Sequence, residues 1–226
     1  GHSPVMIFKD ADIEAAVKHC AAGKFRNAGQ VCISPTRFFI EEPVYDEFIK
    51  SFKSHVEAIN VGDGLDSKST MGPLVADRRL EVMEDFISDA ISSGGEVISG
   101  GGRGQSPGSF FEPTLIRDVP DTAKIMIEEP FGPVAPSASF SSIDEIIERA
   151  NSLPFGLASY AFTSNPRTSQ ILKSEIESGM LAINSMHIHS VETPFGGLKH
   201  SGYGYEGSIE GLEAFLVTKY SSEIYT

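Results

Sequence analysis

Apolar and polar positions follow two periods along this chain, and these periods predict where strands and helices lie. Residues 3–8 form a short apolar run that is typical of a buried strand. Apolar positions at helical spacing then predict a helix that runs to Phe25, with Asp10 as its N-terminal cap. Residues 36–41 are rich in aromatic and β-branched side chains and predict a second strand. The chain therefore opens with a strand, a helix and a strand.

The same alternation continues to residue 184. Pro43 is expected to open an amphipathic helix with Val44, Phe48, Phe52 and Val56 on one face. Further helices are expected over residues 76–93, 143–150 and 166–177, and further strands over residues 96–98, 110–116, 134–140, 158–163 and 180–184. Strands that alternate with helices predict an α/β fold with a mostly parallel sheet covered by helices, and with active groups on loops at the strand ends.

The composition narrows the possible function classes. The 226 residues are 40% hydrophobic and 22% charged, which fits one domain with its own core. A net charge of −13 argues against nucleic-acid binding, which needs clustered Lys and Arg. The sequence has no secretory segment, no apolar run long enough to cross a bilayer and only two cysteines. We therefore expect a reducing, cytoplasmic setting and no membrane partner.

The two cysteines differ in their surroundings. Cys20 shares a predicted helix face with Ala16 and Val17, so we interpret it as a packing residue. Cys32 follows the end of that helix through a short turn that contains Gly29. A thiol becomes nucleophilic when dipoles or a nearby base lower its pKa. Cys32 is therefore a candidate nucleophile, and the alternative is that it too is a small core hydrophobe.

Four segments together decide between these alternatives. They are Phe25-x-Asn27-x-Gly29-Gln30-x-Cys32, Glu128-Glu129-Pro130-Phe131-Gly132-Pro133-Val134, Asn151-Ser152-Leu153-Pro154-Phe155-Gly156-Leu157 and Pro194-Phe195-Gly196-Gly197-Leu198-Lys199-His200-Ser201-Gly202. In this order they resemble the motifs of the aldehyde dehydrogenase superfamily, and the similarity runs from residue 3 to the C-terminus. The resemblance implies a fold of the aldehyde dehydrogenase catalytic-domain type.

The resemblance implies a reaction at Cys32. The thiolate would add to an aldehyde to form a thiohemiacetal, because hydride leaves readily only from a tetrahedral alkoxide. Hydride would pass to NAD or NADP, and water would hydrolyse the remaining thioester to the carboxylic acid. A backbone N–H at or beside Cys32 could stabilise the oxyanion. The expected substrate is a small aldehyde, and a semialdehyde such as succinate semialdehyde is one candidate.

The resemblance also assigns binding residues. Glu129 matches a glutamate that hydrogen-bonds the nicotinamide ribose, and Phe131 would flank the same ring. Taken alone, Glu129 could equally be a solvated charge before a strand. The substrate residues implied by the resemblance are Val31, Ile33, His189 and Phe195, with a core role for Phe195 as its alternative. His187 shares an extended face with His189, but the pair lacks further ligands, so no metal site is predicted.

The resemblance covers only part of such an enzyme. We interpret residues 1–2 as a remnant of an expression tag and residues 3–226 as one catalytic domain without the nucleotide-binding half and the general base. The isolated chain is expected to bind cofactor weakly and to be poorly active. In the parent protein, residues 215–220 resemble the segment through which family subunits associate, so a homo-oligomer is expected.

Two other function classes stay open. Cys32 could act with a histidine as a thioesterase or esterase, which would require a Cys–His contact. The chain could instead be a non-catalytic oligomerisation module, in which Cys32 would be dispensable and the apolar residues 216 and 217 would matter. The sequence leaves the choice between NAD and NADP open, as it does the aldehyde.

Overall fold

A seven-stranded sheet forms the centre of the computed structural model, which describes residues 1–105 and 107–226. The strand order is β3-β4-β5-β2-β1-β7-β8, and among these described strands only β3 and β4 pair antiparallel. The strands are β1 (Ser3–Ile7), β2 (Pro35–Glu41), β3 (Glu96–Ser99), β4 (Thr114–Arg117), β5 (Val134–Phe140), β7 (Ala158–Phe162) and β8 (Met180–Ile183). The prediction of an α/β fold with a mostly parallel sheet is confirmed.

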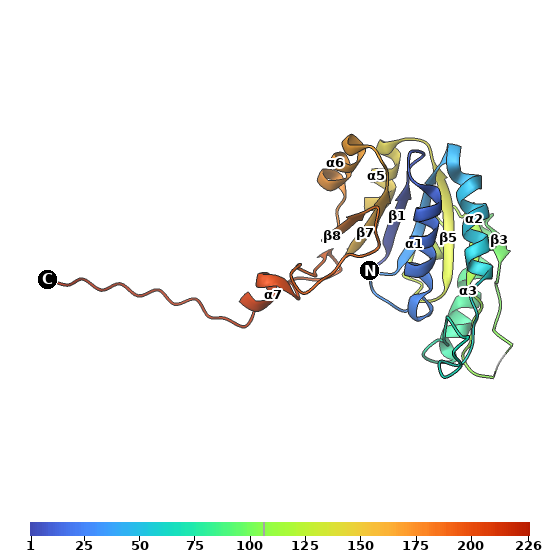
Figure 1. Cartoon of the computed structure of the whole chain (residues 1–226), viewed down its shortest axis with the longest axis horizontal. Helices are drawn as coiled ribbons and strands as arrows, with labels where there is room; N and C mark the ends of the chain where they lie inside the picture. Colours follow the sequence, from blue (N-terminus) through green and yellow to red (C-terminus); the bar gives the residue numbers. More distant parts are fainter. Residues whose placement is uncertain (106) are drawn as a thin grey trace.

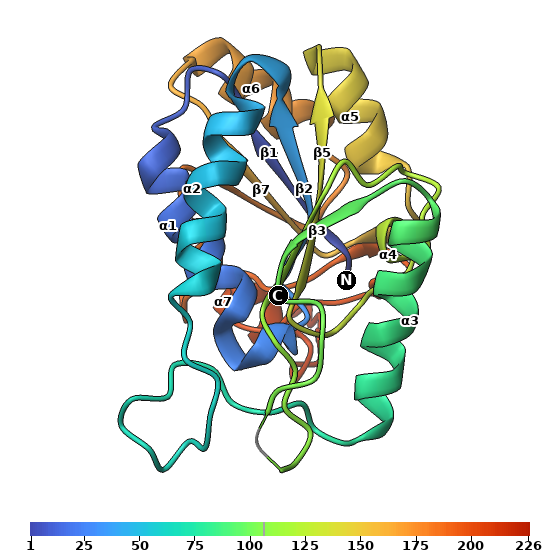
Figure 2. The same ribbon diagram turned by 90° about the vertical axis from the view of Figure 1, so that its right-hand side faces the viewer.

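Helices cover both faces of this sheet. They are α1 (Ile13–Phe25), α2 (Tyr45–Glu57), α3 (Arg78–Ser92), α4 (Lys124–Ile127), α5 (Ile143–Asn151), α6 (Pro166–Glu175) and α7 (Ser208–Glu213), with 3₁₀ turns η1 (Arg26–Gly29) and η2 (Glu42–Val44). Figure 1 shows α5 and α6 on one side of the strands and α1 and α2 on the other, and Figure 2 views the same strands from the side of α2 and α3. The order of the strands explains this arrangement, because right-handed crossovers that move in opposite directions along a sheet place their helices on opposite faces.

Two predicted helix starts are wrong by about half a turn. Asp12, rather than Asp10, caps α1, and its carboxylate accepts the Ala15 N–H at 3.0 Å. Asp10 instead accepts a hydrogen bond from the Thr163 hydroxyl at 2.8 Å, which ties the end of β1 to the end of β7. Pro43 lies in the 3₁₀ turn η2 before α2 begins. A short polar side chain before an apolar run therefore does not say which of two neighbouring aspartates the fold uses as the cap.

One predicted strand is also shorter than expected. Residues 110–113 of the predicted 110–116 strand lie outside β4, which begins at Thr114. Phe111 is nevertheless buried, and it forms an isolated antiparallel bridge with Arg103 outside the seven-stranded sheet.

Aromatic side chains pack α1 and α2 onto β2. The Phe52 ring lies 5.2 Å from Phe38, 5.4 Å from Phe48 and 6.3 Å from Phe25, measured between ring centroids. The predicted face of α2 is thus confirmed for Phe48, Phe52 and Val56, which are all fully buried. Such rings supply much of the apolar area that stabilises a domain of this size.

A buried arginine closes the opposite side of the sheet. Arg37 on β2 donates to the carbonyls of Arg149 and Ala150 at 2.9 Å each. These carbonyls belong to the last turn of α5, where helical carbonyls lack partners within the helix. Burial lowers the pKa of Arg37 to about 10, so the guanidinium stays charged at neutral pH. Arg37 thus acts as a C-terminal cap for α5.

The C-terminal residues leave the domain as an extended arm (Figure 1). Residues 215–220, which resemble a subunit-association segment, form no strand in this chain. Phe215, Val217 and Tyr220 are each more than four-fifths exposed. Within the described residues, no helix combines the length and the hydropathy needed to cross a membrane.

Helix α1, which ends just before the turn that leads to Cys32, carries a buried lysine. Lys24 in α1 has no exposed area, and its ammonium group has no hydrogen-bond partner among the described residues. Burial lowers the pKa of Lys24 to about 7, and the nearby Glu129 carboxylate only partly opposes this shift. Burying an unpaired charge is costly, so Lys24 weakens the fold at neutral pH.

We predict that Lys24→Met stabilises the chain in a pH-dependent way. The folded chain binds the Lys24 proton less tightly than the unfolded chain, so the cost is complete below pH 7 and disappears as the pH approaches 10.5. The gain in unfolding free energy should be on the order of a few kcal/mol at pH 7 and much smaller at pH 10. Urea denaturation of both chains at the two pH values measures this, and an equal gain at both would contradict it.

Candidate active site

The turn that presents Cys32 is built from left-handed backbone. Asn27, Ala28 and Gly29 have φ values of 51°, 53° and 72°, which end α1 abruptly. Two hydrogen bonds of 3.0 Å hold the turn, from Asn27 Nδ2 to the Gln30 carbonyl and from Gln30 Nε2 to the Asn27 carbonyl. Asparagine tolerates this conformation better than most residues, which explains its place in the motif. Cys32 is exposed at the end of the turn.

Glycine at position 29 is required by a contact as well as by its dihedral angle. A Cβ there would lie 2.2 Å from the carbonyl oxygen of Gly132, far inside van der Waals contact. The nucleophile turn therefore packs directly on the turn that carries Glu129 and Phe131. On its other side, the Gln30 amide oxygen accepts the Val75 N–H at 2.9 Å. These contacts fix the turn to two separate loops.

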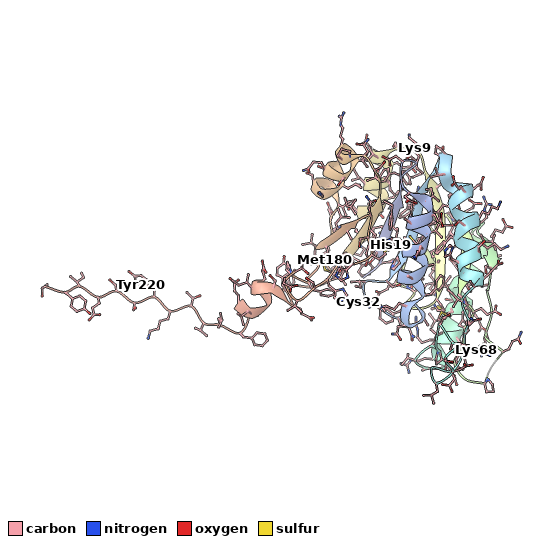
Figure 3. All side chains as sticks on the ribbon, viewed as in Figure 1. Lys9, His19, Cys32, Lys68, Met180 and Tyr220 are labelled. Atoms are coloured by element: carbon pink, nitrogen blue, oxygen red, sulfur yellow. The ribbon has the colours of Figure 1, made fainter. Side chains whose placement is uncertain are left out.

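The order of the parallel strands explains why these loops meet. Cys32 lies shortly before β2, and Glu129 lies shortly before β5, which pairs with β2. Residue 1 precedes β1, the neighbour of β2 on its other side. The site therefore sits at the amino ends of three adjacent strands. Figure 3 shows Cys32 at this lower end of the domain, with His19 above it along α1.

Cavities lie on both sides of the nucleophile turn. The small cavity, of about 220 Å³, is lined by Val31 and Ile33, which flank Cys32. The large cleft, of about 740 Å³, is lined by Asn27 and Gln30 of the same turn. Cys32 itself lines neither space, but the segment around it contributes residues to both.

The large cleft contains both residues predicted to hold the cofactor. Glu129 and Phe131 line it together with Leu74, Val75 and Arg79. Glu129 Oε1 accepts a hydrogen bond from the N-terminal ammonium of Gly1 at 2.8 Å. The cleft thus offers a carboxylate acceptor beside apolar walls, a combination that fits a ribose hydroxyl pair beside a flat ring. The residues present are compatible with one end of a nicotinamide dinucleotide.

Only two of the four substrate residues predicted from the sequence line the small cavity. Val31 and Ile33 line the small cavity, whereas His189 and Phe195 lie outside it. The rings of His189 and Phe195 meet edge to face at 6.3 Å, and a stacked contact of 6.0 Å joins His189 to His187. His187 does line the small cavity. The roles of all five side chains stay predictions.

Sequence reasoning missed three side chains of the small cavity. His19 comes from the middle of α1, Arg26 from the turn η1 that follows it, and Tyr160 from β7. The Tyr160 hydroxyl donates to the Ile33 carbonyl at 2.7 Å and thereby anchors the backbone beside Cys32, while burial raises the pKa of Tyr160. Arg26 lies inside the quoted motif and could have been found there. Tyr160 gave no sequence signal, because its partner is 127 residues away.

The other two motifs form a scaffold beside the site. The two-residue strands β6 (Phe155–Gly156) and β9 (Leu198–Lys199) pair antiparallel, so the third and fourth segments bind each other. The Lys199 ammonium donates to the carbonyls of Asn151 and Leu153 at 2.9 and 3.2 Å. Ser201 Oγ accepts the Gly156 N–H at 3.0 Å. The lysine and serine of the fourth motif therefore have structural partners in the third.

The remaining titratable groups add no second centre within the part of the chain that the structure describes. These residues contain no group of three or more His, Cys, Asp or Glu that could hold a metal ion. Cys20 is fully buried, and burial raises its pKa, so its interpretation as a packing residue is confirmed. His2 is buried and bonds Thr36 Oγ1 at 2.7 Å. The origin of residues 1–2 as a tag remnant stays a prediction.

Fold and site together define an α/β protein that presents an exposed cysteine in a segment whose residues line two cavities. The sequence profile of the aldehyde dehydrogenase family matches residues 1–221. The chain belongs to the aldehyde dehydrogenase family, which confirms the resemblance drawn from the four motifs.

Individual relatives agree with this assignment. The chain is 44% identical over 220 residues to a probable succinate-semialdehyde dehydrogenase [NADP(+)] of Sinorhizobium fredii, which covers 97% of this chain and 45% of that protein. It is 42% identical over 220 residues to a putative 4-(hydroxymethyl)benzenesulfonate dehydrogenase of Comamonas testosteroni, with coverages of 97% and 46%. The crystal structure of succinate-semialdehyde dehydrogenase from Burkholderia pseudomallei superposes with a TM-score of 0.94 at 38% identity, with coverages of 96% and 45%. The chain thus spans less than half the length of these relatives.

We predict that Gly29→Ala disturbs the site through its contact with Gly132. The added methyl group must displace one of the two turns and also strains a φ of 72°, so the chain should lose at least about 1–2 kcal/mol of stability. Alkylation of Cys32 by iodoacetamide should change in rate as the turn moves. Gly64→Ala is the matched control, because a Cβ at residue 64 meets nothing within 4 Å. Equal thermal stability and alkylation in both variants would contradict the prediction.

Proposed function

We propose that residues 3–226 are the catalytic domain of an NAD(P)-dependent aldehyde dehydrogenase that oxidises an aldehyde to a carboxylic acid. The observation that carries this proposal is the exposed Cys32 in a segment whose residues line both the small cavity and the large cleft. Family membership and the names of the relatives support it. The nucleotide-binding half would be supplied by a further part of the full-length protein.

Cys32 would act as the nucleophile. Its thiolate adds to the aldehyde carbonyl carbon, and the carbonyl oxygen becomes an alkoxide bonded to that carbon. In the turn, the Gln30 N–H donates to the Asn27 carbonyl and the Ser34 N–H donates to the Val31 carbonyl. Within the described part of the chain, the Cys32 N–H has no backbone acceptor. That N–H can therefore donate to the oxyanion. Loss of hydride from the alkoxide gives a thioester on Cys32, which water hydrolyses to the acid and the free thiol.

The large cleft would receive the nicotinamide end of the cofactor. Glu129 would accept hydrogen bonds from the ribose hydroxyls, and Phe131 would pack against the ring beside them. Bound NAD or NADP would supply the hydride acceptor for the oxidation. In this chain the Gly1 ammonium pairs with the Glu129 carboxylate, so the proposed ribose acceptor is already engaged. Weak cofactor binding and poor turnover are therefore expected of this chain alone.

The small cavity would bind an aldehyde that carries an anionic group. The ionisable side chains that line it are Arg26, His19, His187 and Tyr160, and none of its lining residues within the described ranges is acidic. Arginine binds carboxylates and sulfonates strongly because it is always charged and offers several donors. The names of two relatives also contain an acid group, as a semialdehyde of succinate and as a benzenesulfonate. Succinate semialdehyde is one substrate of this class.

Two alternatives have less support. A thioesterase would need a histidine bonded to Cys32, and no such bond is present among the described residues. The exposed apolar residues 215–217 favour an association surface, which fits a homo-oligomeric dehydrogenase as well as an assembly module.

We predict that the full-length protein forms NADH or NADPH with an aldehyde panel and that Cys32→Ala abolishes this activity. Cys20→Ala is the matched control, because Cys20 is buried and should leave turnover nearly unchanged. The isolated chain should show little activity. Activity that survives Cys32→Ala would exclude the thiol mechanism, and an inactive full-length protein would favour the hydrolase or assembly alternatives.

We predict that Arg26→Leu in the full-length protein selectively impairs anionic aldehydes. Loss of a charge-assisted contact should raise the KM for succinate semialdehyde by about tenfold or more. The KM for a neutral aldehyde of similar length should change little, and Arg26→Lys should recover part of the affinity. Steady-state kinetics with both substrates measure the difference. An equal rise for both aldehydes would assign Arg26 to the structure of the turn instead.

A further inference from the structure

The turn that carries Glu129 and Phe131 is held by an arginine that the proposed chemistry has not used. Arg79 lies near the start of α3 and lines the large cleft. Its Nη2 donates to the carbonyl of Pro130 and, at 3.4 Å, to the carbonyl of Phe131. Both acceptors belong to the backbone directly after Glu129. One guanidinium thus spans the two peptide units that determine where the Glu129 and Phe131 side chains point.

This backbone needs external support. Phe131 has a φ of 43°, in the left-handed region that costs an aromatic residue about 1–2 kcal/mol. Gly132, the next residue, is confined on two sides, because its carbonyl faces Gly29 and its α-carbon faces the Met83 side chain. Arg79 supplies the contact on the cleft side. Strain of this kind persists only where neighbouring groups fix the conformation.

The charge of Arg79 suits this place. Partial burial lowers the pKa of Arg79, the neighbouring Arg78 lowers it further, and the Glu129 carboxylate opposes both. An arginine remains cationic under such conditions, and its Nη2 alone donates to both carbonyls.

We propose that Arg79 is a positioning residue for the cofactor site, acting through the carbonyls of Pro130 and Phe131 to direct Glu129 and Phe131 into the large cleft. The inference rests on the proposed function, because it takes the cleft as the binding place of the nicotinamide ribose. It goes beyond that function by naming the group that holds the ribose-binding carboxylate in place.

The alternative is that Arg79 touches the cofactor itself. A guanidinium in a nucleotide cleft can pair directly with a phosphate group. The two roles predict different ligand dependence. A positioning residue affects only ligands that contain the nicotinamide ribose, whereas a phosphate partner also affects ADP.

The test is nucleotide binding by the full-length protein, measured by calorimetry with NADPH, NADH and ADP. Arg79→Leu should raise the Kd for whichever reduced dinucleotide binds the wild type by about tenfold or more and leave the Kd for ADP unchanged. Arg79→Lys should recover part of the affinity. Arg78→Leu removes the same charge one residue earlier, from an exposed side chain, and should bind all ligands like the wild type.

Two further measurements separate positioning from a general loss of structure. Alkylation of Cys32 by iodoacetamide without cofactor should proceed at the wild-type rate in Arg79→Leu. In a Glu129→Gln background, Arg79→Leu should add little to the loss of dinucleotide affinity, because both changes disable one unit. If Arg79→Leu does not fold, Arg79→Lys and Arg79→Gln serve in its place.

Several results would overturn the inference. They are wild-type dinucleotide affinity in Arg79→Leu, an equal loss of ADP affinity, an equal effect of Arg78→Leu, or full additivity with Glu129→Gln. The proposed function fails separately, if the wild type binds dinucleotide but oxidises no aldehyde in a Cys32-dependent way. A wild type that binds no dinucleotide would overturn both.

Discussion

The backbone contact between Gly29 and Gly132 is the constraint on which both cavities depend. Each glycine belongs to a loop that enters a parallel strand, and the pairing of β2 with β5 brings the two loops together. Because no side chain separates them, the two turns pack backbone against backbone. The separation of Cys32 from Glu129 therefore depends on the pairing of β2 with β5 and on the absence of side chains at Gly29 and Gly132.

A buried lysine lies beside this contact. Lys24 is buried near the Glu129 carboxylate, and burial lowers its pKa to about 7. A domain that needed only stability would fill such positions with apolar side chains. The ionisable Lys24 near the candidate cofactor carboxylate therefore fits a fold that has lost some stability next to its functional site. Arg37 differs, because its three carbonyl partners give it a purely structural role.

The sequence predicted the fold well where one side-chain pattern decides the outcome. Alternation of strands and helices gave the parallel sheet, and the apolar face of α2 was correct at Phe48 and Phe52. It failed where a choice depends on distant groups, as with Asp10, which binds Thr163 instead of capping α1. The site shows the same division. Cys32 and Glu129 came from local motifs, whereas Arg79 and Tyr160 act on backbone carbonyls 51 and 127 residues away.

The direction of the strands determines at which end of the sheet the candidate site lies. Parallel sheets more often bind ligands beyond their carboxyl ends, yet Cys32, Glu129 and residue 1 all lie at amino ends. The loops at that end are held by the Gly29–Gly132 contact and by the hydrogen bond from the Val75 N–H to Gln30. The large cleft that they line opens to solvent, and the Gly1 ammonium pairs with Glu129 within it. A second wall across that opening would shield the thiol from water and strengthen the polar contacts within, and the relatives have more than twice the length in which to carry it.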